Sequence, residues 1–229
     1  MPFKPRRSTE RELRRRCKQV AKEVARITST GADATSVVYA LEEYAQLLAP
    51  WAQDVMLKIV EMSDQQNLGM WRELGAKMAE RLKTLYTRDA VAIAIRDLSL
   101  EGAKLITSIP LDIAVEVETA AQAAAMTGTR HEALREYIAS RGSVAQSRAE
   151  LIARTEVSRQ TTILTQTRAV SIGSEGYIWR TADDGRVRPS HAAMNGQFVK
   201  WSEPPTLDGL TGHAGALPNC RCYPEPIVV

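Results

Sequence analysis

Apolar residues recur every three to four positions along most of the chain, up to about residue 172. This 3.6-residue repeat is typical of one buried face of an α-helix. The first long stripe contains Val37, Val38, Leu41, Tyr44, Ala45, Leu48, Ala52, Val55, Met56, Ile59 and Val60. A second stripe contains Trp71, Leu74, Met78, Leu82, Leu85, Val91, Ile93, Ile95 and Leu98, and Pro110 is expected to close it. The pattern predicts long helices that bury their stripes against each other or against a partner.

Capping residues, glycines and prolines predict the helix boundaries. Thr9 and Glu12 have capping-box spacing, so a first helix is expected from Thr9 to near Gly31. Pro50 is expected to kink or restart its helix. Two further capping boxes, Thr129 with Glu132 and Ser143 with Gln146, are expected to begin helices. Three glycines are expected to end helices: Gly128, Gly142 and Gly173.

The pattern changes after Gly173. Short strand-like runs at 177–179 and 198–201 flank a turn at 183–185 and a short helix at His191–Asn195. A loop from Pro204 to Pro218 and an extended tail from Cys220 to Ile227 follow, with two prolines confining the tail to a sheet edge. We therefore predict a mainly α fold, with an elongated helical body and a small C-terminal α+β module. The predicted divisions are a basic N-terminal helical arm (1–30), a helical body (31–172) and the C-terminal module (173–229).

Positive charge is concentrated at the start of the chain, although the net charge of the 229 residues is only +3. The cationic residues of this basic arm are Lys4, Arg6, Arg7, Arg11, Arg14, Arg15, Arg16 and Lys18. Such an arm can neutralise phosphates and bind double-stranded DNA of any sequence. A solvated helix face, or an arm that docks on an acidic protein surface, explains the charges equally well. No apolar run is long enough to cross a bilayer, so neither a membrane partner nor export by the usual route is expected.

The C-terminal module gathers the residues with metal-binding chemistry. His191, His213, Cys220 and Cys222 bring two imidazoles and two thiols into a segment too short for a large core. Small modules of this kind need an additional staple, and zinc held by Cys and His is the one available in a reducing compartment. The alternative is that the cysteines pack as small apolar side chains while the histidines form loop hydrogen bonds. We expect a structural zinc at most, and no other cofactor.

Three stretches, taken together, resemble the head-morphogenesis family typified by protein F of phage Mu. These stretches are Leu151–Glu156 (LIARTE), Trp179–Gly196 with its acidic turn and Arg-x-x-Pro-x-His segment, and Pro218–Cys222 (PNCRC). They cover about the last third of the chain, in the order found in that family.

The resemblance implies a structural minor head protein of a tailed phage rather than an enzyme. Such a protein is made in the host bacterial cytoplasm and enters the virion head near the portal vertex, where the portal protein or the inner capsid surface would be its partner. No small-molecule substrate is expected. The alternative is a metal-dependent nuclease or a toxin-like enzyme that acts on nucleic acid. A DNA-binding regulator is disfavoured because the chain has no helix-turn-helix or finger spacing.

Overall fold

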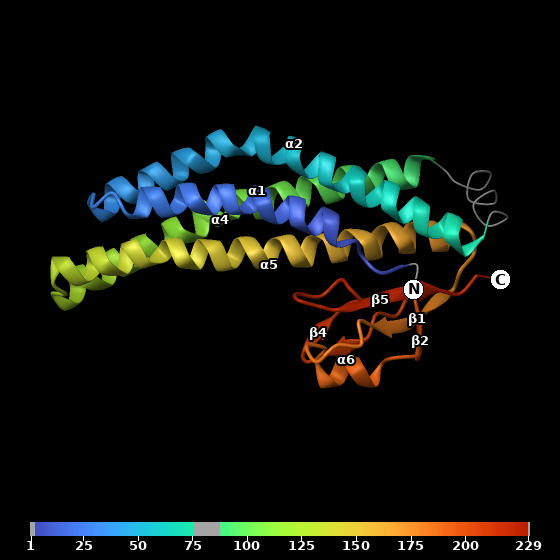
Figure 1. The fold of residues 1–229 in the computed structure, drawn as a ribbon. Coiled ribbons are helices and arrows are strands. Elements are labelled where there is room, and N and C mark those ends of the chain that lie inside the picture. The colour runs from blue at the N-terminus through green and yellow to red at the C-terminus, as the bar shows by residue number, and fades with distance from the viewer. Residues whose placement is uncertain (1–2, 76–87, 229) are drawn as a thin grey trace. The chain divides into compact units, whose positions relative to one another are not determined.

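The computed structural model describes residues 3–75 and 88–228. Four long helices dominate this part of the chain: α1 (Arg7–Thr28), α2 (Ala34–Leu74), α4 (Arg88–Thr127) and α5 (His131–Ser171) (Figure 1). A short helix, α6 (Pro189–Ala193), and five short strands follow. The predicted mainly α fold with a C-terminal α+β module is confirmed. The part of the second predicted stripe at Met78, Leu82 and Leu85 lies outside the described residues.

Several predicted helix boundaries are wrong. The helix α1 begins at Arg7, two residues before the predicted cap Thr9. Pro50 and Pro110 lie inside α2 and α4, so neither restarts nor closes its helix. Each proline removes one backbone hydrogen bond, but buried apolar residues on one face of the helix lie on both sides of it, such as Leu48 and Ala52 around Pro50 and Ile109 and Ile113 around Pro110, and their packing holds the helix together. Gly142 lies within α5, where a Cβ atom would come within 2.7 Å of the Ala25 Cβ. This glycine therefore permits close packing of α5 against α1.

Gly128 follows the last residue of α4 with a φ of +67°, and Gly173 follows α5 with a φ of +84°. Both conformations suit glycine at a helix end, as predicted.

The long helices contribute to two compact units. One unit comprises residues 11–56 and 100–153. Its core consists of apolar side chains such as Leu13, Cys17, Leu41 and Ile106, all fully buried. The other unit comprises residues 1–10, 57–99 and 154–229, and contains the candidate site. Within the described residues, no helix is both long and apolar enough to span a membrane.

A buried polar network joins α5 to the second half of α2 within the second unit. The Arg168 side chain is 1% exposed. Its guanidinium donates to Asn67 Oδ1 at 2.6 Å and forms an ion pair with Asp64. The Asn67 amide in turn donates to Thr165 Oγ1 at 2.7 Å. A buried charge of this kind is tolerated only when it is paired and hydrogen-bonded, so the network fixes how the two helices face each other.

The C-terminal module is built on a three-stranded antiparallel sheet in the order β2-β1-β5. Its strands are β1 (Gly176–Thr181), β2 (Phe198–Lys200) and β5 (Cys222–Pro226). β5 is an edge strand that contains Pro224 and Pro226, as predicted from the sequence. The two-residue strands β3 (Thr206–Leu207) and β4 (Leu210–Thr211) form a separate hairpin, which was not predicted. Tyr177, Trp179 and Trp201 are buried at the centre of the module.

The module packs on the C-terminal half of α5 through hydrogen bonds. The Thr162 hydroxyl donates to the Ala214 carbonyl at 2.7 Å, and the Asn219 N–H donates to Thr155 Oγ1 at 3.2 Å. Gly215 lies at the closest approach, with a φ of +88°. A Cβ atom there would be 2.6 Å from Thr162 Oγ1 and 3.0 Å from the Cys222 carbonyl oxygen. Only glycine therefore fits this contact.

Replacing Arg168 by Ala should lower the free energy of unfolding by about 3 kcal/mol, because the buried Asn67 and the partly buried Asp64 would lose their partner. Urea unfolding followed by circular dichroism measures this loss. Arg148→Ala is the control, since the Arg148–Asp112 pair is substantially exposed and should contribute about 0–1 kcal/mol. Equal losses in the two variants would contradict a central role for the Arg168 network.

Replacing Gly215 by Ala should loosen the module through backbone strain and the clash with Thr162, at a cost of about 1–3 kcal/mol. Hydrogen exchange followed by mass spectrometry should show faster exchange across residues 174–228, with the α1 amides unchanged. Gly185→Ala is the matched control in the same module, because a Cβ atom there meets nothing within 4 Å. Normal exchange in the Gly215 variant would show that the contact with α5 does not hold the module.

Candidate functional site

Three of the four predicted metal-binding residues meet in the interior of the C-terminal module. His191 lies on α6, Cys222 begins β5, and Cys220 lies two residues earlier. Their ligand atoms all lie within 4.8 Å of one another. His191 Nδ1 is 3.4 Å from Cys220 Sγ and 3.6 Å from Cys222 Sγ. His191 is 1% exposed, Cys220 7% and Cys222 2%.

The local structure that places His191 follows from the sequence around it. Pro189 begins α6, as expected for the first residue of a helix. Gly196, with a φ of +86°, turns the chain back toward β2, and its N–H donates to the Trp179 carbonyl at 2.8 Å. The Trp179 indole packs edge-on against the His191 ring, with 5.6 Å between centroids. The imidazole is thereby held in a fixed orientation toward the two thiols.

The two cysteines differ in their electrostatic surroundings. A hydrogen bond from the Cys222 thiol, above all, lowers the pKa of Cys220. The Gly215 N–H also donates to Cys220 Sγ, at 3.3 Å. The same thiol hydrogen bond, together with burial, raises the pKa of Cys222. The buried Trp179 indole N–H has no oxygen or nitrogen acceptor in the described part of the chain, and it interacts with the Cys222 thiol. Cys220 is therefore the sulfur that more readily becomes a thiolate.

The far side of the His191 ring faces a carboxylate that sequence reasoning missed. Asp208 Oδ2 lies 4.0 Å from His191 Nε2 and accepts a hydrogen bond from the Ser190 hydroxyl at 2.7 Å. The Arg188 guanidinium lies 3.5 Å from the same nitrogen and 3.9 Å from the carboxylate. Asp208 and Gly209 form the turn of the β3–β4 hairpin, both with positive φ. An Asp-Gly pair between two short runs is a strong hairpin signal, and could have identified this turn from the sequence.

His213 lies apart from this cluster, which corrects the predicted set of four ligands. Its Nδ1 is 3.2 Å from Tyr177 Oη, which also accepts the Ala214 N–H at 3.1 Å. The His213 ring packs edge-on against Tyr177 and Trp201. Burial lowers the pKa of His213, which favours the neutral imidazole. His213 is therefore a half-buried histidine that is hydrogen-bonded to Tyr177.

The predicted DNA-binding residues lie in or just before α1, in different surroundings. Arg15 and Arg16 both bond to Glu12, and these bonds, Arg15 first, lower the pKa of Glu12 to about 2. Four others are exposed: Lys4, Arg6, Arg7 and Arg11, of which Arg6 lies 3.6 Å from Glu73. Arg14 is half-buried, and Lys18 is exposed and pairs with Glu150 at 2.8 Å. The arm is therefore an ordered helix with several of its charges already engaged.

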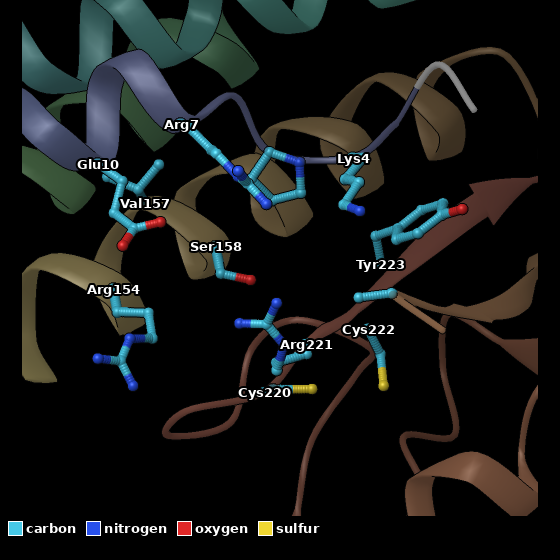
Figure 2. Close-up of a pocket in the computed structure, with 12 residues that line it drawn as sticks. Lys4, Arg7, Glu10, Arg154, Val157, Ser158, Cys220, Arg221, Cys222 and Tyr223 are labelled. Atoms are coloured by element: carbon cyan, nitrogen blue, oxygen red, sulfur yellow. The ribbon is translucent and has the colours of Figure 1, made fainter. Parts of the chain in front are cut away.

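A basic pocket lies beside the cysteine segment. This cavity of about 100 Å³ is lined by four cationic side chains and one acidic side chain: Lys4, Arg7, Arg154, Arg221 and Glu10. Figure 2 shows the Arg7 and Arg221 side chains extending toward the same region of the pocket, whereas the Cys222 sulfur points away from Lys4 and Arg7. The Arg221 guanidinium also pairs with Asp184, which lowers the pKa of that carboxyl. The excess of cations makes this pocket a candidate site for an anion.

The sequence has recognisable relatives. A family model described as "Phage Mu protein F like protein" matches residues 115–224. A Haemophilus influenzae protein named "Uncharacterized protein" is 33% identical over 134 residues, which are 58% of this chain and 29% of the relative. The chain thus spans less than a third of the length of that relative. No solved structure matches the chain.

The matched segment runs from the second half of α4 to β5. It includes the three stretches on which the predicted resemblance rests, together with His191, Cys220 and Cys222. Residues 115–224 are therefore a Mu protein F-like region, and the family resemblance predicted from the sequence is confirmed.

Proposed function

We propose that this chain is a structural minor head protein of a tailed phage, which acts in head morphogenesis near the portal vertex and is retained in the virion. The observation that carries the proposal is the family match over residues 115–224. That segment contains all of α5 and most of the C-terminal module, the two elements joined by the contacts at Thr162 and Asn219. Assembly of a head needs modules whose surfaces keep a fixed position. The contacts between α5 and the C-terminal module hold the module in such a position.

The surroundings of the reactive side chains support a structural role over the enzymatic alternative. A nuclease or a toxin-like transferase must bring its substrate to a nucleophile, a general base or a metal. His191, Cys220 and Cys222 are the groups best suited to such chemistry, and they are almost completely buried. Their burial suits a centre that stabilises the module.

One helix presents apolar side chains that suit a docking partner. Leu100, Leu111, Val115 and Met126 are exposed on α4, with exposures of 42%, 40%, 62% and 88%. At 100° per residue they fall within about 80° of one another around the helix axis. Exposed Lys104 and Gln122 lie between them on the same face, so the face offers a protein partner both apolar and polar contacts. We assign this face of α4 to the portal protein or the inner capsid surface.

The basic pocket supports contact with packaged DNA. Lys4 and Arg7 were predicted as DNA-binding residues, and both line the pocket together with Arg154 and Arg221. A phosphate group carries the charge that this cluster attracts, and contacts of this type need no base sequence. We propose that DNA phosphates bind there after the genome enters the head.

A phage that lacks this chain should give defective heads or particles poor in DNA, and complementation with the wild-type chain should restore them. Val115→Asp should fail to complement, because it places a charge on the proposed docking face, whereas Val115→Leu should succeed. Both variants should unfold within about 0.5 kcal/mol of wild type, since the position is exposed. Electron microscopy and DNA content of purified particles measure the outcome.

Two results would contradict this proposal. One is normal heads without the chain. The other is a hydrolytic or transferase activity of the purified protein that His191→Ala abolishes while heads stay normal, which would favour the enzymatic alternative.

Replacing Lys4 and Arg7 by Ala should weaken binding to duplexes of any sequence. The logarithm of the binding constant falls with the logarithm of the salt concentration, and each lost phosphate contact should make this slope less steep by about 0.9. The slope of the double variant should therefore be less steep by about 1.8. Lys22→Ala with Arg26→Ala is the matched control, because it removes the same charge from α1 outside the predicted set. Fluorescence anisotropy with a labelled duplex over a salt series measures both slopes. Equal slopes in the two double variants would show that the pocket is not the DNA site.

A further inference from the structure

We propose that His191 Nδ1, Cys220 Sγ and Cys222 Sγ bind one Zn²⁺ ion, and that Asp208 holds the His191 ring in the tautomer that binds it. The proposal rests on the geometry and chemistry of these four side chains. It does not depend on a role in the phage head.

The distances within the cluster match a tetrahedral zinc site. Zinc lies about 2.3 Å from a cysteine sulfur and about 2.1 Å from a histidine nitrogen. With tetrahedral angles, these bond lengths place the nitrogen and each sulfur about 3.6 Å apart. The observed separations are 3.4 Å to Cys220 and 3.6 Å to Cys222. Zinc would therefore change these two nitrogen-to-sulfur separations by only about 0.2 Å or less.

The chemistry of the donors favours zinc over harder cations. Two thiolates and an imidazole form a soft donor set, whereas Mg²⁺ and Ca²⁺ require oxygen ligands. The Gly215 N–H donates to Cys220 Sγ at 3.3 Å, and charge-assisted hydrogen bonds of this kind stabilise a thiolate. A divalent ion also removes the cost of burying that negative charge.

Asp208 provides the partner that a metal-bound histidine needs. An imidazole that binds metal through Nδ1 carries its proton on Nε2, and that N–H usually donates to a carboxylate or a carbonyl. Asp208 Oδ2 lies 4.0 Å from His191 Nε2, and the Ser190 hydroxyl fixes the carboxylate by a hydrogen bond of 2.7 Å. The contact forms when the Arg188 guanidinium, whose Nη1 lies 3.5 Å from the same nitrogen, turns away and the carboxylate approaches Nε2. Asp208 is therefore a positioning residue for His191.

The cluster fills three positions of the zinc tetrahedron. Among the described residues, no further His, Cys, Asp or Glu joins the cluster. His213 is engaged with Tyr177, and Asp184 with Arg221. The site thus differs from the closed four-ligand site that the sequence predicted.

The test measures metal in protein purified under reducing conditions. Wild-type protein should contain about one equivalent of zinc by inductively coupled plasma mass spectrometry. Cys222→Ser and His191→Ala should lose it. His213→Ala and Cys17→Ser are the matched controls, a histidine and a cysteine outside the cluster, and both should keep the metal. Asp208→Asn should retain the site but bind zinc about 10- to 100-fold more weakly in competition with a chromophoric chelator.

A second measurement uses only the wild-type chain, so it does not depend on whether a variant folds. Cobalt added to the metal-free protein should produce the sulfur-to-cobalt charge-transfer absorption of a thiolate site, and one equivalent of zinc should abolish it. Two results would each overturn the proposal. One is a reduced wild-type protein that neither contains zinc nor gives this absorption. The other is zinc that remains bound in folded Cys222→Ser and His191→Ala.

Discussion

In the unit that contains the candidate site, the packing of α5 against α2 depends on the contacts of the buried Arg168 guanidinium with Asp64 and Asn67. Removing a charge of this size from water costs several kcal/mol, so it must meet a carboxylate and further acceptors in good geometry. Asp64 and Asn67, one turn apart on α2, provide them. The register between α2 and the end of α5 is therefore specified by polar contacts, whereas apolar packing alone tolerates shifts. The hydroxyls of Thr155 and Thr162, also on α5, bond to the C-terminal module.

Those hydroxyls connect the helix to the cysteine cluster in a short series of contacts. Thr162 bonds to the Ala214 carbonyl, and the next residue, Gly215, donates its N–H to Cys220 Sγ. The turn at 214–219 is thus held between α5 and a thiol. Because Gly215 cannot carry a side chain at this contact, the distance between α5 and the cluster is fixed. A position of α5 set by Arg168 is transmitted in this way to the geometry around His191.

The sequence predicted the helices well because a 3.6-residue stripe extends over many residues, and it predicted their ends poorly at Pro110 and Gly142. Prolines and glycines are local signals, and packing between distant segments overrode them at both positions. Only three of the four predicted metal-binding residues form the cluster, again because contacts between distant segments decide the outcome. Cys220 and Cys222 are near neighbours, but only the fold decides that His191 meets them while His213 bonds to Tyr177. Asp208 was missed because its role depends on a hairpin that brings it to α6.

The Cys-x-Cys spacing has a physical meaning in this fold. Successive side chains of an extended segment point to opposite sides, and backbone pairing with β1 reaches Arg221, whose carbonyl accepts the Ala182 N–H at 2.8 Å. Both sulfurs therefore face the interior, while Arg221 faces the basic pocket and pairs with Asp184 (Figure 2). In a Cys-x-x-Cys segment with the same extended conformation, one of the two sulfurs would face the basic pocket. A metal held by the two thiols would thus also fix the backbone that positions Arg221, and the proposed zinc site and the proposed phosphate site would occupy the two faces of one short segment.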